Sequence, residues 1–162
     1  MRTGKIDPSV GGGRYVDVDQ DEVDSSLIDR ISTAGATNVI VRGTFGRRNR
    51  ASALAWLEQV PPFNALDIYS PNIPTIPHQV LANLTSLGLV GRLIEPLDFS
   101  AARRLSVIGV RRASDLADAL TSCRLTSIRV ERWTDDDLLQ LAPAVDLECL
   151  TIRGVGQDLE ES

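Results

Sequence analysis

The chain has 162 residues, of which 43% are hydrophobic and 24% charged, so it is long enough to fold as one domain around a core of its own. Aromatic residues make up only 4%, and we therefore expect a core of Leu, Ile, Val and Ala. The net charge of -5 excludes a general affinity for nucleic acid, because phosphate binding needs clustered cationic side chains. A protein partner with a basic surface is the better match.

The N-terminal residues carry no apolar run long enough for a signal peptide, and the chain has no stretch of 18 consecutive apolar residues. We therefore expect a cytoplasmic protein with no membrane partner. Residues 1–12 are predicted to be a flexible N-terminal entry, and Gly11 to Gly13 are the expected hinge if the N-terminal stretch forms a cap. Cys123 and Cys149 lack a CxxC spacing, so we expect reduced, partly buried thiols.

An acidic run from Asp17 to Asp24 has the DxDxD opening of a calcium loop. The turn glycine of such a loop is missing after Asp21, and Ile28 stands where the last carboxylate is needed. A strand end that leads into the acidic first turn of a helix explains the run better. The single histidine, His78, has no nucleophile motif beside it, so we expect no catalytic residue, no metal site and no cofactor.

A six-residue pattern with apolar residues at its first, fourth and sixth positions recurs along the chain. Weak copies begin at Gly13 and Ala36, and regular copies, spaced 20 to 22 residues apart, begin at Phe63, Leu84, Leu105, Leu125 and Leu147. The fourth and sixth positions differ by two, the period of a strand, so each copy predicts a short strand with both side chains on one face. About 15 residues separate successive strands, which is enough for the crossover of a parallel pair.

The stretches between these strands have helical patterns. They are residues 22–32, 47–60, 78–83, 114–122 and 134–142, with Ser114 and Thr134 as expected helix caps. Within residues 47–60, Trp56 falls on an apolar helical stripe and is predicted to be part of the core. Helices on one face and a parallel β-sheet on the other predict an α/β solenoid of about 6–7 units in a single domain, residues 1–162. Its parts are expected to be irregular units or a cap (13–62), regular repeats (63–154) and a polar tail (155–162).

The regular copies resemble the LxxLxL units of the leucine-rich repeat family, and residues 133–152 look like the cysteine-containing repeats of F-box-type proteins. This resemblance implies a right-handed solenoid. The family usually has an Asn shortly after LxxLxL, where this chain has Gly91, Arg112, Arg132 and Gly154. We therefore expect degenerate repeats without an asparagine ladder. An ordinary α/β domain in which the pattern recurs by chance is the alternative.

Side chains at the third and fifth positions of each copy, and one residue beyond the sixth, are expected on the open face of the sheet. This face is predicted to be acidic at its N-terminal end and basic at its C-terminal end, with a low-charge floor between them from small or apolar residues such as Gly88 and Gly109. Trp133, next to Arg132, is expected to be exposed and to anchor an interface. The predicted partner-binding residues are Tyr15, Asp17, Asp19, Arg42, Asp67, Tyr69, Val90, Arg111, Arg129, Glu131, Trp133 and Arg153.

These features favour a non-catalytic protein-binding module, and most concretely a bacterial immunity protein or antitoxin that holds and neutralises a partner toxin. An alternative is a scaffold or regulatory subunit of a larger complex. Such a subunit would self-associate through the strand edge near Leu150 to Ile152, because a bare sheet edge invites pairing. A third possibility is an enzyme that uses Asp67 with Asp17 or Asp19, although no spacing in the sequence fixes such a pair.

Overall fold

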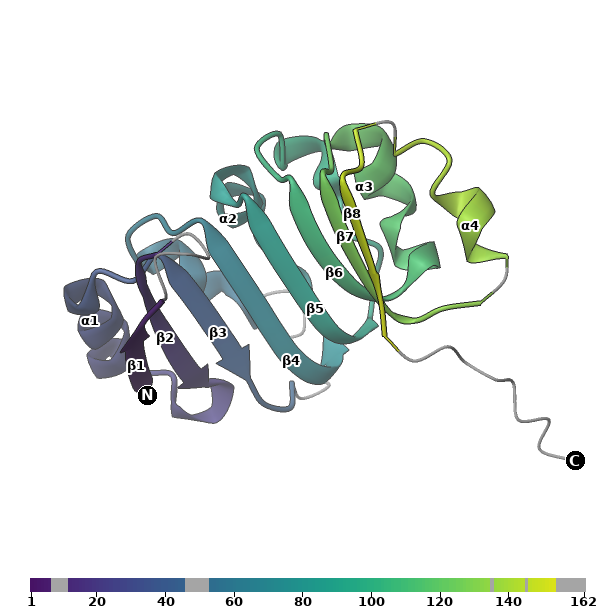
Figure 1. Ribbon diagram of the computed structural model, residues 1–162. Coiled ribbons are helices and arrows are strands. Elements are labelled where there is room, and N and C mark those ends of the chain that lie inside the picture. Colours follow the sequence, from purple (N-terminus) through teal and green to yellow (C-terminus); the bar gives the residue numbers. More distant parts are fainter. Residues whose placement is uncertain (7–11, 46–52, 135, 145, 154–162) are drawn as a thin grey trace, which may run out of the picture.

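The computed structural model describes residues 1–6, 12–45, 53–134, 136–144 and 146–153. These residues form an α/β fold with an open eight-stranded sheet, in which the strands lie side by side in chain order (Figure 1). Strand β1 pairs antiparallel with β2, and every later neighbouring pair is parallel. The strands are β1 (Arg2–Lys5), β2 (Arg14–Asp19), β3 (Asn38–Arg42), β4 (Ala65–Ile73), β5 (Ser86–Leu93), β6 (Val107–Arg112), β7 (Ser127–Arg132) and β8 (Cys149–Ile152).

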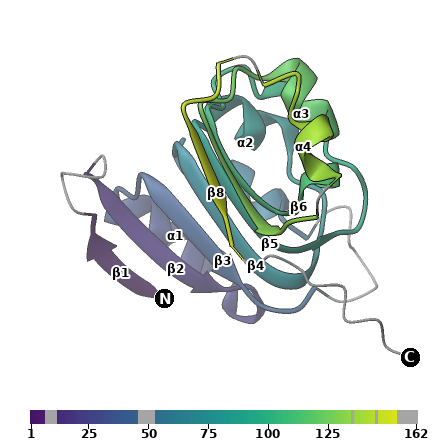
Figure 2. The same ribbon diagram turned by 45° about the vertical axis from the view of Figure 1, so that its right-hand side comes forward.

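Short helices connect the strands and lie on one side of the curved sheet, which leaves its other face open (Figures 1 and 2). The α-helices are α1 (Ser25–Ala34), α2 (His78–Asn83), α3 (Ala117–Ser122) and α4 (Asp137–Gln140). The 3-10 helices are η2 (Gln20–Glu22), η4 (Ala55–Gln59), η5 (Phe99–Ala101) and η6 (Ala113–Leu116). No helix among the described residues is long and apolar enough to cross a membrane.

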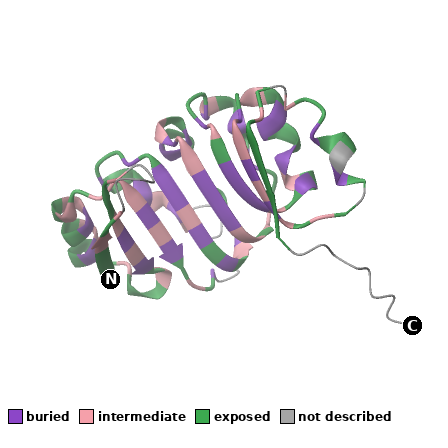
Figure 3. Ribbon diagram, viewed as in Figure 1, coloured by how far each residue is buried: buried purple, intermediate pink, exposed green. Residues whose placement is uncertain are grey.

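The strand positions and their facing are confirmed. The fourth and sixth residues of each copy from β2 to β7 are at most 1% exposed, while the residues between them are more exposed along most strands (Figure 3). The parallel register aligns these buried residues, so that Val39 of β3 lies between Val16 of β2 and Leu66 of β4. The buried positions are Val16, Val18, Val39, Val41, Leu66, Ile68, Leu87, Leu89, Ile108, Val110, Ile128 and Val130. Burial of each such side chain stabilises the fold by about 1.5–3 kcal/mol.

Helix α1 begins three residues later than predicted because Gln20–Glu22 form a separate turn, η2. The Asp24 carboxylate then caps α1, accepting a hydrogen bond from the Leu27 N–H at 2.8 Å. The helix ends at Gly35, whose φ of 63° is the left-handed conformation that favours glycine. Leu27 and Ile31, four residues apart, are the buried residues of this helix.

Two predicted segments differ from the structure. Residues 2–5, expected to be flexible, form the antiparallel strand β1, while residues 7–11 lie outside the described part of the chain. Of the helix predicted at 47–60, the described residues form only the 3-10 turn η4. Within it Trp56 is buried, as predicted, and its Nε1–H donates to Gln20 Oε1 at 3.0 Å. The crossover that leads to β4 is therefore anchored by side chains more than by a long helix.

The last predicted helix is also shorter than expected, since α4 covers only four residues. Its start differs from the predicted threonine cap. The Asp137 carboxylate accepts a hydrogen bond from the Thr134 N–H at 2.7 Å, and the Asp137 N–H donates to the Thr134 carbonyl at 3.0 Å. Asp137 is therefore held at 6% exposure with its charge compensated by a backbone donor.

Candidate functional site

The open face of the sheet consists of three rows of side chains that run across the strands. The rows follow the parallel register, in which Asp17 pairs with Ile40, Ile40 with Asp67, and so on to Thr151. The first row is Tyr15, Asn38, Ala65, Ser86, Val107, Ser127 and Cys149; the second is Asp17, Ile40, Asp67, Gly88, Gly109, Arg129 and Thr151; the third is Asp19, Arg42, Tyr69, Val90, Arg111, Glu131 and Arg153.

At the N-terminal end of this face, three neighbouring strands hold Arg42 in place. Its Nε donates to both carboxylate oxygens of Asp17 at 3.0 Å, and its guanidinium carbon lies 4.3 Å from the centre of the Tyr69 ring. The ion pair and the cation–π contact are each worth about 1 kcal/mol or less at such a solvated surface. Together they orient Arg42 and Tyr69, which lowers the ordering cost that a ligand contact with these two side chains would carry.

At Gly88 and Gly109 the middle of the face is covered by charged side chains, and there the prediction of a low-charge floor is wrong. Added to Gly88, a Cβ would overlap Asp67 Oδ1, and added to Gly109 it would lie 3.0 Å from Arg129 Nη2. The side chains of Asp67 and Arg129 therefore lie over these two glycines and cover them. Two glycines in one row make room for an acid and a base to extend toward each other from β4 and β7.

Asp67 is a partly buried carboxyl group of this face. Burial raises its pKa above the ordinary aspartate value, against the opposing influence of the positive charges of Arg129 and Arg42. Arg129 Nε lies 3.4 Å from Glu131 Oε1, yet it is buried and has no partner in hydrogen-bonding geometry among the described residues. These groups carry charge in a partly dehydrated place, where interactions with a ligand are stronger than in open water.

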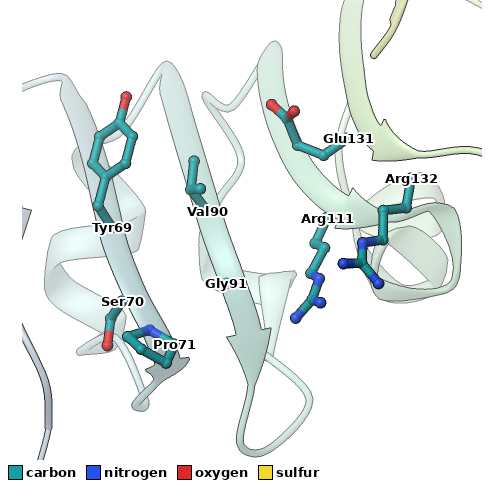
Figure 4. A pocket seen from close by; sticks show the side chains of 8 residues that line it. All are labelled: Tyr69, Ser70, Pro71, Val90, Gly91, Arg111, Glu131 and Arg132. Carbon is teal, nitrogen blue, oxygen red and sulfur yellow. The ribbon is translucent and has the colours of Figure 1, made fainter. Parts of the chain in front are cut away.

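A pocket of about 540 Å³ opens beside this pair, between β4 and β7 near the carboxyl ends of the strands (Figure 4). In Figure 4, Tyr69 stands on one side, Val90 lies between, and Arg111 and Arg132 point toward the same end of the strands. The lining residues are Tyr69, Ser70, Pro71, Val90, Gly91, Arg111, Glu131 and Arg132. The pocket combines an apolar floor with two arginines and one glutamate, and this net positive lining suits a group that combines an apolar part with a carboxylate.

An irregularity in β4 shapes this pocket. The pairing of β4 with β5 shifts between Tyr69 and Asn72, and the Ser70 hydroxyl donates to the Asn72 carbonyl at 2.9 Å within the bulge. Opposite the bulge, Gly91 has φ 149°, and a Cβ there would overlap the Ser70 carbonyl oxygen. Only glycine allows the two backbones to approach this closely.

Comparison of the chain with protein-family models, curated proteins and solved structures found no match. The geometry of the open face is therefore what indicates a function.

The predicted partner-binding residues lie together on the open face, with one exception. Trp133 is half-buried and packs against the core, so the expectation that it is exposed is wrong. It follows the end of β7, where the chain turns back toward the helices. Asp19 lies at the edge of the face and also caps η2, accepting from the Asp21 N–H at 3.0 Å.

Four pocket residues, Ser70, Pro71, Gly91 and Arg132, were not predicted from the sequence. Three of them, Ser70, Gly91 and Arg132, lie two positions beyond the six-residue pattern, and Pro71 follows Ser70. This position falls near the carboxyl end of each strand. The sequence signal for these residues is that the same position recurs in successive copies of the pattern.

Other candidate groups have structural roles. Asp17 and Asp24 of the acidic run are used separately, one in the pair with Arg42 and the other as the α1 cap. His78 lies on the helix side, with its Nε2 3.5 Å from Asp98 Oδ2, and both side chains are exposed. The two cysteines are free, Cys123 half-buried and Cys149 exposed, so the prediction of partly buried thiols holds only for Cys123.

Proposed function

We propose that this chain is a degenerate leucine-rich-repeat-like solenoid that binds another protein on its open face. Support for the solenoid comes from seven consecutive parallel strands that share one register, six of which, β2 to β7, bury the same pair of positions. Each of these strands contacts mainly its neighbours, which is the organisation of repeat proteins.

The observation that carries the binding proposal is the pocket, together with the charge order of the face around it. Asp17, Asp19 and Asp67 lie toward the N-terminal strands together with a base, Arg42, whereas Arg111, Arg129, Arg132 and Arg153 lie toward the C-terminal ones together with an acid, Glu131. A partner with a basic patch for the acidic end, and with a carboxylate-bearing side chain for the pocket, matches this order and is bound in one orientation.

A role in binding is favoured over acid–base catalysis by the position of Asp67. Its pKa is raised, as expected of some catalytic acids, but it does not line the pocket, and Asp17 is tied to Arg42. The most specific form of the proposal is an immunity protein or antitoxin, in which the bound partner is a toxin with a basic surface. A subunit that organises a larger complex uses the same face in the same way.

The test is capture of a partner from a lysate of the source organism, followed by calorimetry with the purified partner. Arg111→Glu reverses the charge at the pocket and is expected to weaken binding about tenfold or more, because the new carboxylate would face the carboxylate of the partner. The control is Arg103→Glu, the same change at an exposed residue outside the open face. Equal affinities of the two variants would contradict the proposal.

A further inference from the structure

The two edges of the sheet differ in character. Strand β1 forms one edge with the polar residues Arg2 to Lys5, which is a common way to prevent edge-to-edge association. Strand β8 forms the other edge, and no strand among the described residues pairs with its outer side. There Leu150 is 36% exposed and Ile152 40%, whereas their counterparts on β7 are fully buried.

The backbone of β8 exposes its hydrogen-bonding groups at these same two residues. The Cys149 and Arg153 N–H groups point inward, donating to the Thr126 and Val130 carbonyls at 3.0 and 2.9 Å. Since the N–H and C=O groups of successive strand residues point to alternate sides, those of Leu150 and Ile152 point to the free edge. Unpaired backbone groups and exposed apolar side chains thus coincide.

We propose that β8 pairs with β8 of a second copy of this chain, antiparallel, with the two-fold axis at Thr151. In this register Leu150 of each copy faces Ile152 of the other, so the same pair occurs on both sides of the axis. Both residues are in hydrogen-bonded positions. An axis at Cys149 would place Leu150 opposite Glu148 instead, and an axis at Leu150 would place Ile152 opposite Glu148. Only the axis at Thr151 matches both apolar residues with apolar residues.

Helix α4 lies at the same end of the molecule as β8 (Figure 1), and its Leu139, 80% exposed, adds apolar surface to that end.

A second copy also suits the shape of the fold. A two-fold axis perpendicular to the sheet keeps the open faces of both copies on one side and joins their cores on the other. The apolar row that ends at Leu150 then continues into the partner copy without a gap. This pairing uses residues distinct from Arg111 and the pocket, so it does not depend on the proposed function.

Sedimentation velocity over a series of concentrations tests the association. We expect wild-type dimers, and at least roughly tenfold weaker association for Ile152→Lys, because a lysine at an edge strand opposes pairing. The matched control is Val107→Lys, which changes a valine of the same 40% exposure on the open face, away from the edge. Circular dichroism verifies that both variants are folded. A wild type that stays monomeric up to about 100 µM overturns the proposal.

Disulfide trapping tests the register, in a background in which Cys149→Ser removes the native thiol of β8. Thr151→Cys then places two thiols opposite each other in a non-hydrogen-bonded pair, where Cα atoms are about 4.5 Å apart, within the range of disulfides. We expect a covalent dimer on mild oxidation, detected by non-reducing denaturing electrophoresis. Arg153→Cys in the same background is expected to give no covalent dimer, because it faces position 149 of the other copy, which then has no thiol.

The expected result for Arg153→Cys changes when the native Cys149 is present. In a chain that keeps Cys149, Arg153→Cys faces a thiol across the axis and is expected to give a covalent dimer. Cys123 does not compete, because burial raises the pKa of its thiol to about 11 and its Sγ donates to the Ala102 carbonyl at 3.3 Å. A wild-type dimer whose Thr151→Cys variant fails to cross-link would overturn this register. Loss of partner capture in Arg111→Glu, with dimerisation intact, would support the proposed function and would leave the pairing of β8 unaffected.

Discussion

Glycines on β5 and β6 determine where groups from neighbouring strands lie on the open face. Gly88 and Gly109 have no side chains, and for that reason Asp67 and Arg129 can extend over them. Gly91 likewise allows the backbone of β5 to approach the bulge of β4 at the pocket. The absence of a Cβ at three positions thus determines where charge and space occur on the face.

The raised pKa of Asp67 leads to a prediction about pH. Because the folded state binds the proton more tightly than the unfolded state, the stability associated with protonated Asp67 is present below the unfolded pKa of about 4 and is lost as pH rises through the folded value. Asp67→Asn removes this titration. We expect its midpoint of urea unfolding, relative to wild type, to increase as pH rises through that window.

The control for this experiment is Asp29→Asn, which changes an exposed carboxylate on α1. It is expected to show no comparable rise relative to wild type. If Asp67→Asn instead loses stability relative to wild type as pH rises, attraction to Arg129 and Arg42 outweighs burial.

Among the secondary-structure elements, the strands were predictable and the connections were only partly so. A period of two with buried Val, Leu and Ile identifies strands such as β3 and β7, because the side chains between the buried ones must face solvent. The 3-10 turn at Ala55–Gln59 was not predictable, since its stripe around Trp56 fits an α-helix equally well. Strand β1 has no apolar alternation and depends on its neighbour β2 for pairing.

The candidate site was predictable as a set of positions but not as a geometry. Register alone placed Asp67 and Arg129 on the open face. Their approach across two strands depends on glycines in other repeats, and the pocket depends on a bulge that the pattern does not encode. Gly88 and Gly109 occur at the same position of consecutive copies, which was the available signal.

The cap of α1 provides a prediction for an element. Asp24→Ala removes the acceptor of the Leu27 N–H and is expected to lower the free energy of unfolding by about 1 kcal/mol. Asp24→Ser keeps a capping oxygen and should retain most of that stability. Chemical denaturation of the three proteins measures the difference. Equal losses in both variants would show that the carboxylate acts through its charge and not as a cap.

Across the molecule as a whole, one core cluster runs from β2 to the helices beside β7, and its row of strand residues reaches the surface at β8. If β8 pairs with a second copy, unfolding is coupled to dissociation. The thermal midpoint of wild type is then expected to rise by about 2 °C for each tenfold increase in protein concentration. Differential scanning calorimetry measures this, and Ile152→Lys should show a midpoint independent of concentration.

The parallel register has a consequence for how this chain tolerates changes in length. The distance in sequence between equivalent buried residues is 27 from Val39 to Leu66 but 21 from Leu66 to Leu87, yet both steps advance the sheet by one strand. The extra residues are accommodated in the crossover, without shifting the rows of the open face. Insertions on the helix side, such as a fluorescent label or an affinity tag, are therefore compatible with an unchanged binding face.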